Sequence, residues 1–337
     1  MTTEDERIKA ATIFDVARLA GVSHQTVSRV LNDLPNVRPA TRERVEKAIR
    51  QLRYVPSPAA RALVTRRSRT IGLITTGVAE FGSSTTAVYF NEAARDERYA
   101  VIMASLLQVN ATTLRQAAET LVRQNVEAIV LITSNSATLN LLQSMDLGVP
   151  FLAVVSRGSG LHRVSLDQYA GARRAVRHLI DLGHTEIRHL AGPLESMDAV
   201  ERMRGWRDAL GENGLVAHEP MLGDWSADSG FAAGRRLAGE QFTAVFCGND
   251  QMALGMIHAL TEAGRMVPSD VSVLGFDDIP EAAHFSPPLT TVHQDFAQLG
   301  RDALALILAV LADEGAPNPL LRVPDLVVRA STAAPSR

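Results

Sequence analysis

The segment GVSHQTVSRVLN, residues 21–32, combines the start of a helix with two faces of different character. Ser23 is a favourable N-cap, and the apolar residues that follow it recur at the i, i+3, i+4 spacing that buries one stripe of a helix. The opposite face carries the polar side chains of Gln25, Ser28, Arg29 and Asn32. The pattern predicts a short amphipathic helix with a polar face available for binding.

Two flanking segments extend this unit. Upstream, TIFDVARLAG (residues 12–21) predicts another short helix, because Thr12 and Asp15 have the spacing of a capping box and Gly21 stands where a helix would end. Two short helices joined by a glycine-containing turn form a helix-turn-helix. Downstream, residues 41–54 predict a third helix whose apolar stripe closes a small core. The alternative is an amphipathic bundle with a solvated polar face.

Charge favours the helix-turn-helix. Residues 1–69 contain 14 lysines and arginines against 7 acidic residues, whereas the rest of the chain contains 20 against 30. Nucleic acid is bound largely through neutralisation of its phosphates, so a basic module with an exposed Gln and Arg suits duplex DNA. The acidic remainder is expected to stay off the DNA.

Length and composition limit the class of protein. The chain has 337 residues, 46% of them hydrophobic, which allows two or three domains with a sizeable core. Neither an apolar run long enough to cross a bilayer nor a signal-peptide pattern is evident, so we expect a cytoplasmic protein with no membrane partner. The single cysteine, Cys247, lies in an apolar run that predicts a buried strand.

The segment after the third helix is predicted to be a linker. Pro56 and Pro58 interrupt regular structure, while Ser57 as an N-cap predicts one or two helical turns up to Leu63. So short a helix is unstable alone, and DNA is the surface expected to stabilise it. We therefore predict a DNA-binding domain over residues 1–55, a hinge helix and linker over residues 56–69, and a core over residues 70–337.

From residue 70 onward, apolar strand-like runs alternate with segments of helical length. The runs are TIGLITTG, YAVIMAS, EAIVLITS, VPFLAVV, EIRHLAG, TAVFCGND and VSVLGFDD. This alternation predicts parallel α/β sheets with right-handed crossovers. The region is long for one open sheet, so we expect two similar lobes with a cleft at the carboxyl ends of the strands.

Polar residues follow several of these runs. Asn249 follows AVFCG, Asp277 follows SVLGF, and Arg202 lies beyond HLAGP. Together with Trp225 they suit a polyol, because acids and amides pair with hydroxyl groups and an indole face stacks on C–H edges. The alternative is that the Asp and Asn cap helices and that Trp225 belongs to the core.

Six motifs occur in a defined order: QTVSRV (25–30), AGPL (191–194), GDWSA (223–227), NDQMALG (249–255), PPLTT (287–291) and QDF (294–296). With these motifs the chain resembles the LacI/GalR family of transcriptional repressors over about residues 11–334. The resemblance implies an N-terminal helix-turn-helix domain of three helices plus a hinge helix. After this domain, the resemblance implies a periplasmic-binding-protein type I core. That core has two Rossmann-like lobes, and the chain crosses between them three times.

The resemblance also implies DNA contacts. His24, Gln25 and Arg29 fall where family members read base edges in the major groove, Arg29 suiting guanine and Gln25 adenine. The implied phosphate contacts are Ser23, Thr26 and Asn32, with Ser28 on the same polar face. In the hinge, the matching residues are Pro58, Ala60 and Leu63, of which Leu63 would be wedged into the minor groove at the operator centre.

In the core, the residues implied to contact an effector are Phe81, Arg202, Trp225, Asn249, Asp277, Gln294 and Phe296. The implied function is a repressor of sugar-utilisation genes that a mono- or disaccharide releases from a palindromic operator. A regulator with a purine or other small metabolite as corepressor is the alternative. The chain ends at STAAPSR without a leucine-heptad tail, so we expect a homodimer.

An enzyme is a weaker interpretation. The sequence shows no Gly-rich dinucleotide fingerprint, no phosphate-binding loop and no nucleophile elbow. His178, His184 and His189 fall in a segment that predicts helix, turn and strand, which would scatter them rather than form a metal site. We expect no catalytic residue, metal or cofactor, and the basic N-terminal module opposes a free sugar-binding protein.

Overall fold

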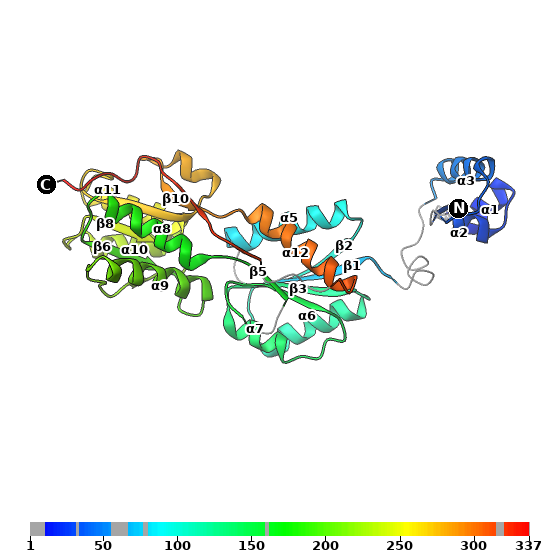
Figure 1. Cartoon of the computed structure of the whole chain (residues 1–337), viewed down its shortest axis with the longest axis horizontal. Helices are drawn as coiled ribbons and strands as arrows, with labels where there is room; N and C mark the ends of the chain where they lie inside the picture. The colour runs from blue at the N-terminus through cyan, green and yellow to red at the C-terminus, as the bar shows by residue number, and fades with distance from the viewer. Residues whose placement is uncertain are drawn as a thin grey trace, which may run out of the picture. The chain divides into compact units, whose positions relative to one another are not determined.

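The computed structural model describes residues 11–31, 34–54, 67–76, 80–158, 162–314 and 320–336. The chain forms two compact units that divide between Ser68 and Arg69 (Figure 1). The N-terminal unit is helical, and the C-terminal unit consists of two α/β lobes. Among the described residues, no helix combines the length and apolar character needed to span a bilayer.

The helical unit contains α1 (Ile13–Ala20), α2 (His24–Leu31) and α3 (Pro39–Leu52). The predicted capping box is present, since the Asp15 carboxylate accepts the Thr12 backbone N–H at 2.9 Å and the Thr12 hydroxyl accepts that of Asp15 at 3.4 Å. Gly21 ends α1 in the left-handed region with φ of 64°, and the Ser23 hydroxyl accepts the Thr26 N–H at 3.2 Å. The helix signals in the sequence are therefore confirmed.

One small core holds the three helices together. The side chains of Val16, Val27 and Val45 are fully buried at its centre, one from each helix. The third helix begins at Pro39 rather than at Thr41, because proline fits the first turn of a helix, where no N–H is needed. The predicted helix-turn-helix with a third closing helix is confirmed.

The first lobe of the α/β unit is a parallel six-stranded sheet with the order β11-β5-β4-β3-β1-β2. Its strands are β1 (Thr70–Thr76), β2 (Ala100–Leu106), β3 (Ala128–Ile132), β4 (Phe151–Val154), β5 (His162–Leu166) and β11 (Leu320–Arg322). Its helices are α5 (Phe81–Asp96), α6 (Ala111–Arg123), α7 (Ser136–Gln143) and α12 (Phe296–Leu311). Helices α5 and α12 cover one face of the sheet, and α6 and α7 cover the other (Figure 1).

The second lobe has the sheet order β12-β10-β9-β8-β6-β7, in which only the described β12 pairing is antiparallel. Its strands are β6 (Ile187–Ala191), β7 (Met221–Leu222), β8 (Ala244–Cys247), β9 (Ser272–Asp277), β10 (Thr290–His293) and β12 (Asp325–Val327). Its helices are α8 (Gln168–Asp181), α9 (Met197–Glu212), α10 (Ala227–Leu237), α11 (Asp250–Glu262) and the 3-10 helix η1 (Pro280–His284). Helices α8 and α9 pack on one face and α10 and α11 on the other.

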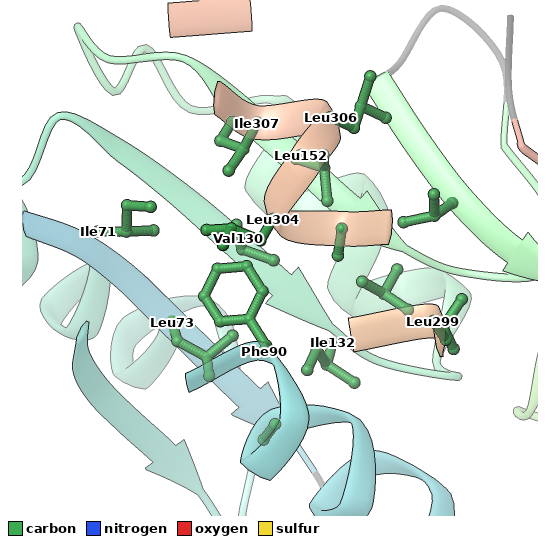
Figure 2. Close-up of a cluster of buried hydrophobic side chains, with 14 of the residues drawn as sticks. Ile71, Leu73, Phe90, Val130, Ile132, Leu152, Leu299, Leu304, Leu306 and Ile307 are labelled. Carbon is green, nitrogen blue, oxygen red and sulfur yellow. The ribbon is translucent and has the colours of Figure 1, made fainter. Parts of the chain in front are cut away.

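Helix α12 packs into the first lobe although it follows the whole second lobe in sequence. Figure 2 shows Leu304 and Ile307 of α12 in the same buried cluster as Phe90 of α5, over the sheet. A Cβ at Gly300 would lie only 2.7 Å from the Phe90 backbone nitrogen, so glycine permits this close helix contact. Each such buried side chain contributes roughly 1.5–3 kcal/mol, which makes the C-terminal helix part of the first lobe's core.

The chain crosses between the lobes at three places: after Leu166, after His293 and after Arg322. The crossings lie side by side, since the Asp167 N–H donates to the Arg322 carbonyl at 2.7 Å. The predicted two-lobed architecture with three crossings is confirmed.

All seven strand-like runs are strands, and Cys247 is buried in β8 as expected. Five further strands escaped the sequence analysis: β5, β7, β10, β11 and β12. These strands have five residues or fewer, and β5 (HRVSL) is polar at three positions, so no apolar run marks it.

Candidate functional site

The polar face of α2 lies at the surface of the helical unit. Val27 and Val30 point into the core, whereas His24, Gln25 and Arg29 are exposed. The other polar side chains on this side are Ser23, which is exposed, and Thr26 and Ser28, which are half-buried. Polar side chains with donors and acceptors at a helix surface can reach base edges and phosphates in a groove.

Phe14 adds an apolar group to this surface. Its side chain is 61% exposed, and its ring centroid lies 5.2 Å from that of His24. The sequence analysis did not single out Phe14. A signal was available, because the buried residues of α1 are Val16, Ala17 and Ala20, and Phe14 lies off that stripe.

The α/β unit contains a cavity of about 800 Å³ lined by residues of both lobes. All seven predicted effector residues line this cavity: Phe81, Arg202, Trp225, Asn249, Asp277, Gln294 and Phe296. They come from the carboxyl ends of strands β9 and β10, from the starts of helices α5, α11 and α12, from α9 and from the loop before α10. The structure therefore gathers residues that are more than 200 positions apart in the sequence.

A buried ion pair forms the floor on the second lobe. Arg202 Nη2 lies 3.4 Å from Asp277 Oδ1, and Gln294 donates to the same oxygen at 2.6 Å. Arg202 also donates to the Gly248 carbonyl and to Gln168 Oε1. Burial raises the pKa of Asp277 to about 6, although Arg202 and Gln294 both act to lower it.

Trp225 stands above this pair in a half-buried position. The guanidinium carbon of Arg202 lies 5.4 Å from the indole centroid and 4.0 Å from the ring of Phe276. A Cβ at Gly192 would approach the indole to 2.2 Å, so the absence of a side chain there lets the ring lie flat over the strand end. Trp225 thus lines the cavity and also packs against the core of the second lobe.

Asn249 is a helix cap, as one alternative predicted, and it also lines the cavity. Its Oδ1 accepts the Met252 N–H at 2.9 Å, which caps α11, and its Nδ2 donates to the Trp225 carbonyl at 3.0 Å. Asn249 therefore caps a helix and lines the cavity at the same time. Asp277 ends β9 and caps no helix, with φ of 111°.

The first lobe supplies an apolar wall. Phe81 and Phe296 meet edge to face with ring centroids 5.8 Å apart. The other apolar residues of this wall are Leu107, Val109, Ile132, Ala137, Leu141, Val154, Val155, Leu166 and Leu299. A bound molecule would therefore meet the buried ion pair on the second lobe and a mixture of hydrocarbon and polar groups, such as Glu80 and Asn135, on the first.

The lining of the cavity carries more acidic than basic side chains. Its lining includes the carboxyl groups of Glu80, Glu195, Asp198, Asp224 and Asp277. Arg202 is the one Lys or Arg among the described lining residues, and its guanidinium is already paired. Burial, and then the charge of Asp198, raises the pKa of Glu80 to about 7.

The three histidines of residues 178–189 serve the packing of the second lobe. His178 and His184 bond the C-terminal segment at Thr332 and Ala333, and the His189 ring stacks on Phe246 with centroids 4.8 Å apart. Within the described ranges, no three His, Cys, Asp or Glu side chains are placed to hold a metal.

Two family models match the two parts of the chain. Residues 12–57 match the bacterial regulatory proteins of the lacI family, and residues 176–332 match a periplasmic binding protein-like domain. The chain is 34% identical over 333 residues to the lactose operon repressor of Escherichia coli, covering 98% of this chain and 92% of that protein. The chain belongs to the LacI family. It is a DNA-binding transcriptional regulator and not an enzyme.

Other LacI-family proteins show the same extent of similarity. The repressor PurR of Vibrio atlanticus is 34% identical, with 96% of this chain and 98% of that protein covered. A crystal structure of a Lac repressor dimer bound to operator and the anti-inducer ONPF superposes with a TM-score of 0.90 over 97% of this chain and all of that chain, at 34% identity. A CelR–cellobiose complex superposes with a TM-score of 0.72, at 32% identity over 95% of this chain and 99% of that chain.

The LacI-family residues assigned from the sequence fall into two groups. Those in α2 and in the cavity are placed as described above. Four lie outside the described residues: Asn32, Pro58, Ala60 and Leu63. The sequence analysis missed Gln168, which lines the cavity and bonds Arg202, because it follows the strand β5 that no apolar run marked.

Proposed function

We propose that this LacI-family regulator represses transcription as a homodimer on a pseudo-palindromic operator, and that a neutral mono- or disaccharide in the cavity releases it. The two-fold symmetry of a dimer requires an operator of matching symmetry. The Lac repressor dimer bound to operator, to which the chain is similar throughout, supports this assembly. Binding to the chromosome also implies a cytoplasmic location.

The DNA contacts follow from the exposed face of α2. Arg29 is proposed to read guanine, Gln25 adenine, and His24 a neighbouring base, because these side chains are exposed on one surface. Ser23, Thr26, Ser28 and Asn32 are proposed to contact phosphates or to line the same face. In the hinge, Leu63 is proposed to enter the minor groove, with Pro58 and Ala60 in the helix that carries it.

The observation that carries the effector proposal is the polar floor of the cavity. Asp277 and Asn249 can pair with hydroxyl groups, and the face of Trp225 can stack on the C–H edges of a sugar ring. Five carboxyl groups against one paired guanidinium favour an uncharged ligand over a sugar phosphate or a uronate. The relative CelR forms a complex with cellobiose, a neutral disaccharide.

Release from DNA is proposed to follow from a change in the angle between the lobes. A saccharide that contacts both lobes stabilises one inter-lobe angle over another. The first lobes of the two protomers then change their positions in the dimer, which moves the two hinge segments apart. A differential affinity of about 1–3 kcal/mol for the two states is enough for useful regulation.

The experiment is a thermal-shift screen of the full-length chain against neutral saccharides, their phosphates and purines. A ligand that binds the folded state raises the melting temperature Tm in proportion to RT ln(1 + [L]/Kd). We expect a neutral saccharide to raise Tm in the wild type and not in Asp277→Asn, and the same saccharide to release operator DNA. Stabilisation by purines alone would replace the inducer proposal with the corepressor alternative.

A further inference from the structure

We propose that Gln168 is a positioning residue that ties the effector-binding pair to the crossings between the lobes. The link to effector response rests on the proposed function, whereas the link to lobe geometry stands on the structure alone. Gln168 is the first residue of α8, directly after the first crossing, and its side chain is 5% exposed. It belongs to a closed ring of four buried side chains.

The ring runs through four contacts. Arg202 Nε donates to Gln168 Oε1 at 2.9 Å, and Gln168 Nε2 donates to Gln294 Oε1 at 2.7 Å. Gln294 Nε2 then donates to Asp277 Oδ1 at 2.6 Å, and Asp277 returns to Arg202 across 3.4 Å. The two amides thus bridge an ion pair, and all four side chains are less than 10% exposed.

The order of donors and acceptors in the ring has one solution. Arg202 can only donate, and an ionised Asp277 can only accept. This fixes both amide orientations, because a flip of Gln168 or Gln294 alone would set two donors or two acceptors face to face. In a buried site with low dielectric constant such a mismatch is costly, so the ring holds one geometry.

The ring lies at the three crossings between the lobes, which together form the pivot about which the lobes can move. Gln168 follows the first crossing and Gln294 lies in the second, so their hydrogen bond joins these two segments. The neighbouring residue, Asp167, joins the third through its N–H bond to the Arg322 carbonyl at 2.7 Å. Arg322 in turn binds Asp302 of α12 in the first lobe at 2.6 Å.

A movement at the pivot must therefore change the ring, and a change at Arg202 or Asp277 must reach the pivot. Hydroxyl groups that compete for Asp277 or Arg202 would alter the same hydrogen bonds that tie the crossings together. Two discrete arrangements of one hydrogen-bonded element can couple a ligand site to a hinge in this way.

The test measures lobe geometry without any ligand. Cys247 is buried, so spin labels can be placed at Arg115→Cys on α6 and Ala232→Cys on α10, both exposed sites in different lobes. Labelled chain is diluted with unlabelled chain so that only distances within one protomer are measured. We expect Gln168→Met to shift the inter-lobe distance or broaden its distribution by about a factor of two relative to the parent.

A rescue variant distinguishes a role of Gln168 in the hydrogen-bonded ring from a general contribution of its side chain to packing. Gln168→Glu keeps the bond from Arg202 but places a second acceptor against Gln294, so it should broaden the distribution as Gln168→Met does. Adding Asp277→Asn allows the ring to close again at the same net charge. Gln294 then donates to the new Glu and accepts from the Nδ2 of the new Asn, whose amide rotates so that its Oδ1 faces Arg202. The double variant should therefore regain the parental distribution.

The control is Gln143→Met, since Gln143 is exposed at the end of α7 and belongs neither to the ring nor to the crossings. It should leave the distribution unchanged. A parental distribution in Gln168→Met, or a double variant no narrower than Gln168→Glu, would overturn the proposal whatever the saccharide screen finds. Failure of that screen would instead remove the effector proposal and leave this result standing.

Discussion

The surface of α2 and the cavity use polar side chains in opposite ways. In α2 the candidate contacts lie within residues 23–29 at the surface, where water can satisfy them. In the cavity the ring of Gln168, Arg202, Asp277 and Gln294 spans residues 168–294, and its members are buried and bonded to one another. The surface set is made by one helix and the buried set by the meeting of two lobes.

This difference has an energetic consequence. Removing an exposed side chain of α2 should change DNA affinity and leave stability nearly unchanged. Removing a member of the buried set leaves its partners without hydrogen bonds in a site of low dielectric constant, so stability and ligand binding should fall together. Variants in each region test whether function and stability separate as this comparison predicts.

The largest effect is expected at Asp277. Asp277→Ala leaves Arg202 buried without its carboxylate and Gln294 without its acceptor, which should cost about 3–5 kcal/mol of the free energy of unfolding. Urea unfolding followed by tryptophan fluorescence measures the loss. Asp228→Ala, at an exposed position of α10, is the control and should change the free energy of unfolding little. A loss at Asp277 no greater than the loss at Asp228 would contradict the comparison.

The next effect is expected at Arg29. Arg29→Ala should weaken binding to the specific operator by about 1–3 kcal/mol while leaving the melting temperature unchanged. Arg29→Lys keeps the charge but loses the two-pronged geometry, so it should recover binding to random DNA better than operator binding. Equal losses on operator and random DNA would show that Arg29 does not read bases.

A smaller effect is expected from the capping box of α1. Thr12→Ala removes the side-chain acceptor for the Asp15 N–H and keeps only the backbone carbonyl of residue 12. This should cost about 1 kcal/mol, seen as faster hydrogen exchange of the α1 amides in the full-length chain. Thr112→Ala in α6 is the control, because its cap bond uses the backbone N–H, which alanine retains. Unchanged exchange in α1 would mean that tertiary packing alone holds this helix.

The smallest effect is a pH dependence at Glu80. Its pKa is raised from 4.5 to about 7, so the folded state binds a proton more tightly than the unfolded state, and stability falls as pH rises through that window. Glu80→Gln lacks this titration and should gain about 2 °C over the wild type at pH 8 but not at pH 5.

One neighbouring group is independent of this comparison and one is coupled to it. His189, whose pKa is lowered to about 4, is present in both proteins and cancels in the difference. Asp277, whose pKa is raised to about 6, is one of the charges that raise the pKa of Glu80, so the difference reports the two carboxyl groups together. The same difference in Tm at both pH values would show that Glu80 titrates normally.

The local features were predictable from short windows of sequence. The capping box at Thr12 and Asp15, the glycine stop at Gly21 and the buried stripe of α2 each depend on residues within one or two turns. Long apolar runs predicted seven strands, and polar residues after three of them, with Trp225, predicted the cavity. Short strands such as β5 carry too few residues for a pattern to emerge.

The sequence by itself determined the helix-turn-helix, the alternation of strands and helices, and the chemical character of the cavity, because caps, periodicity and residue type are local properties. Only the tertiary structure decided that Gln168 joins Gln294, that α12 completes the first lobe, and that Arg202 meets Asp277. Those contacts join segments from 75 to more than 200 residues apart, and sheet order and lobe crossings, rather than any neighbouring residues, bring such segments together.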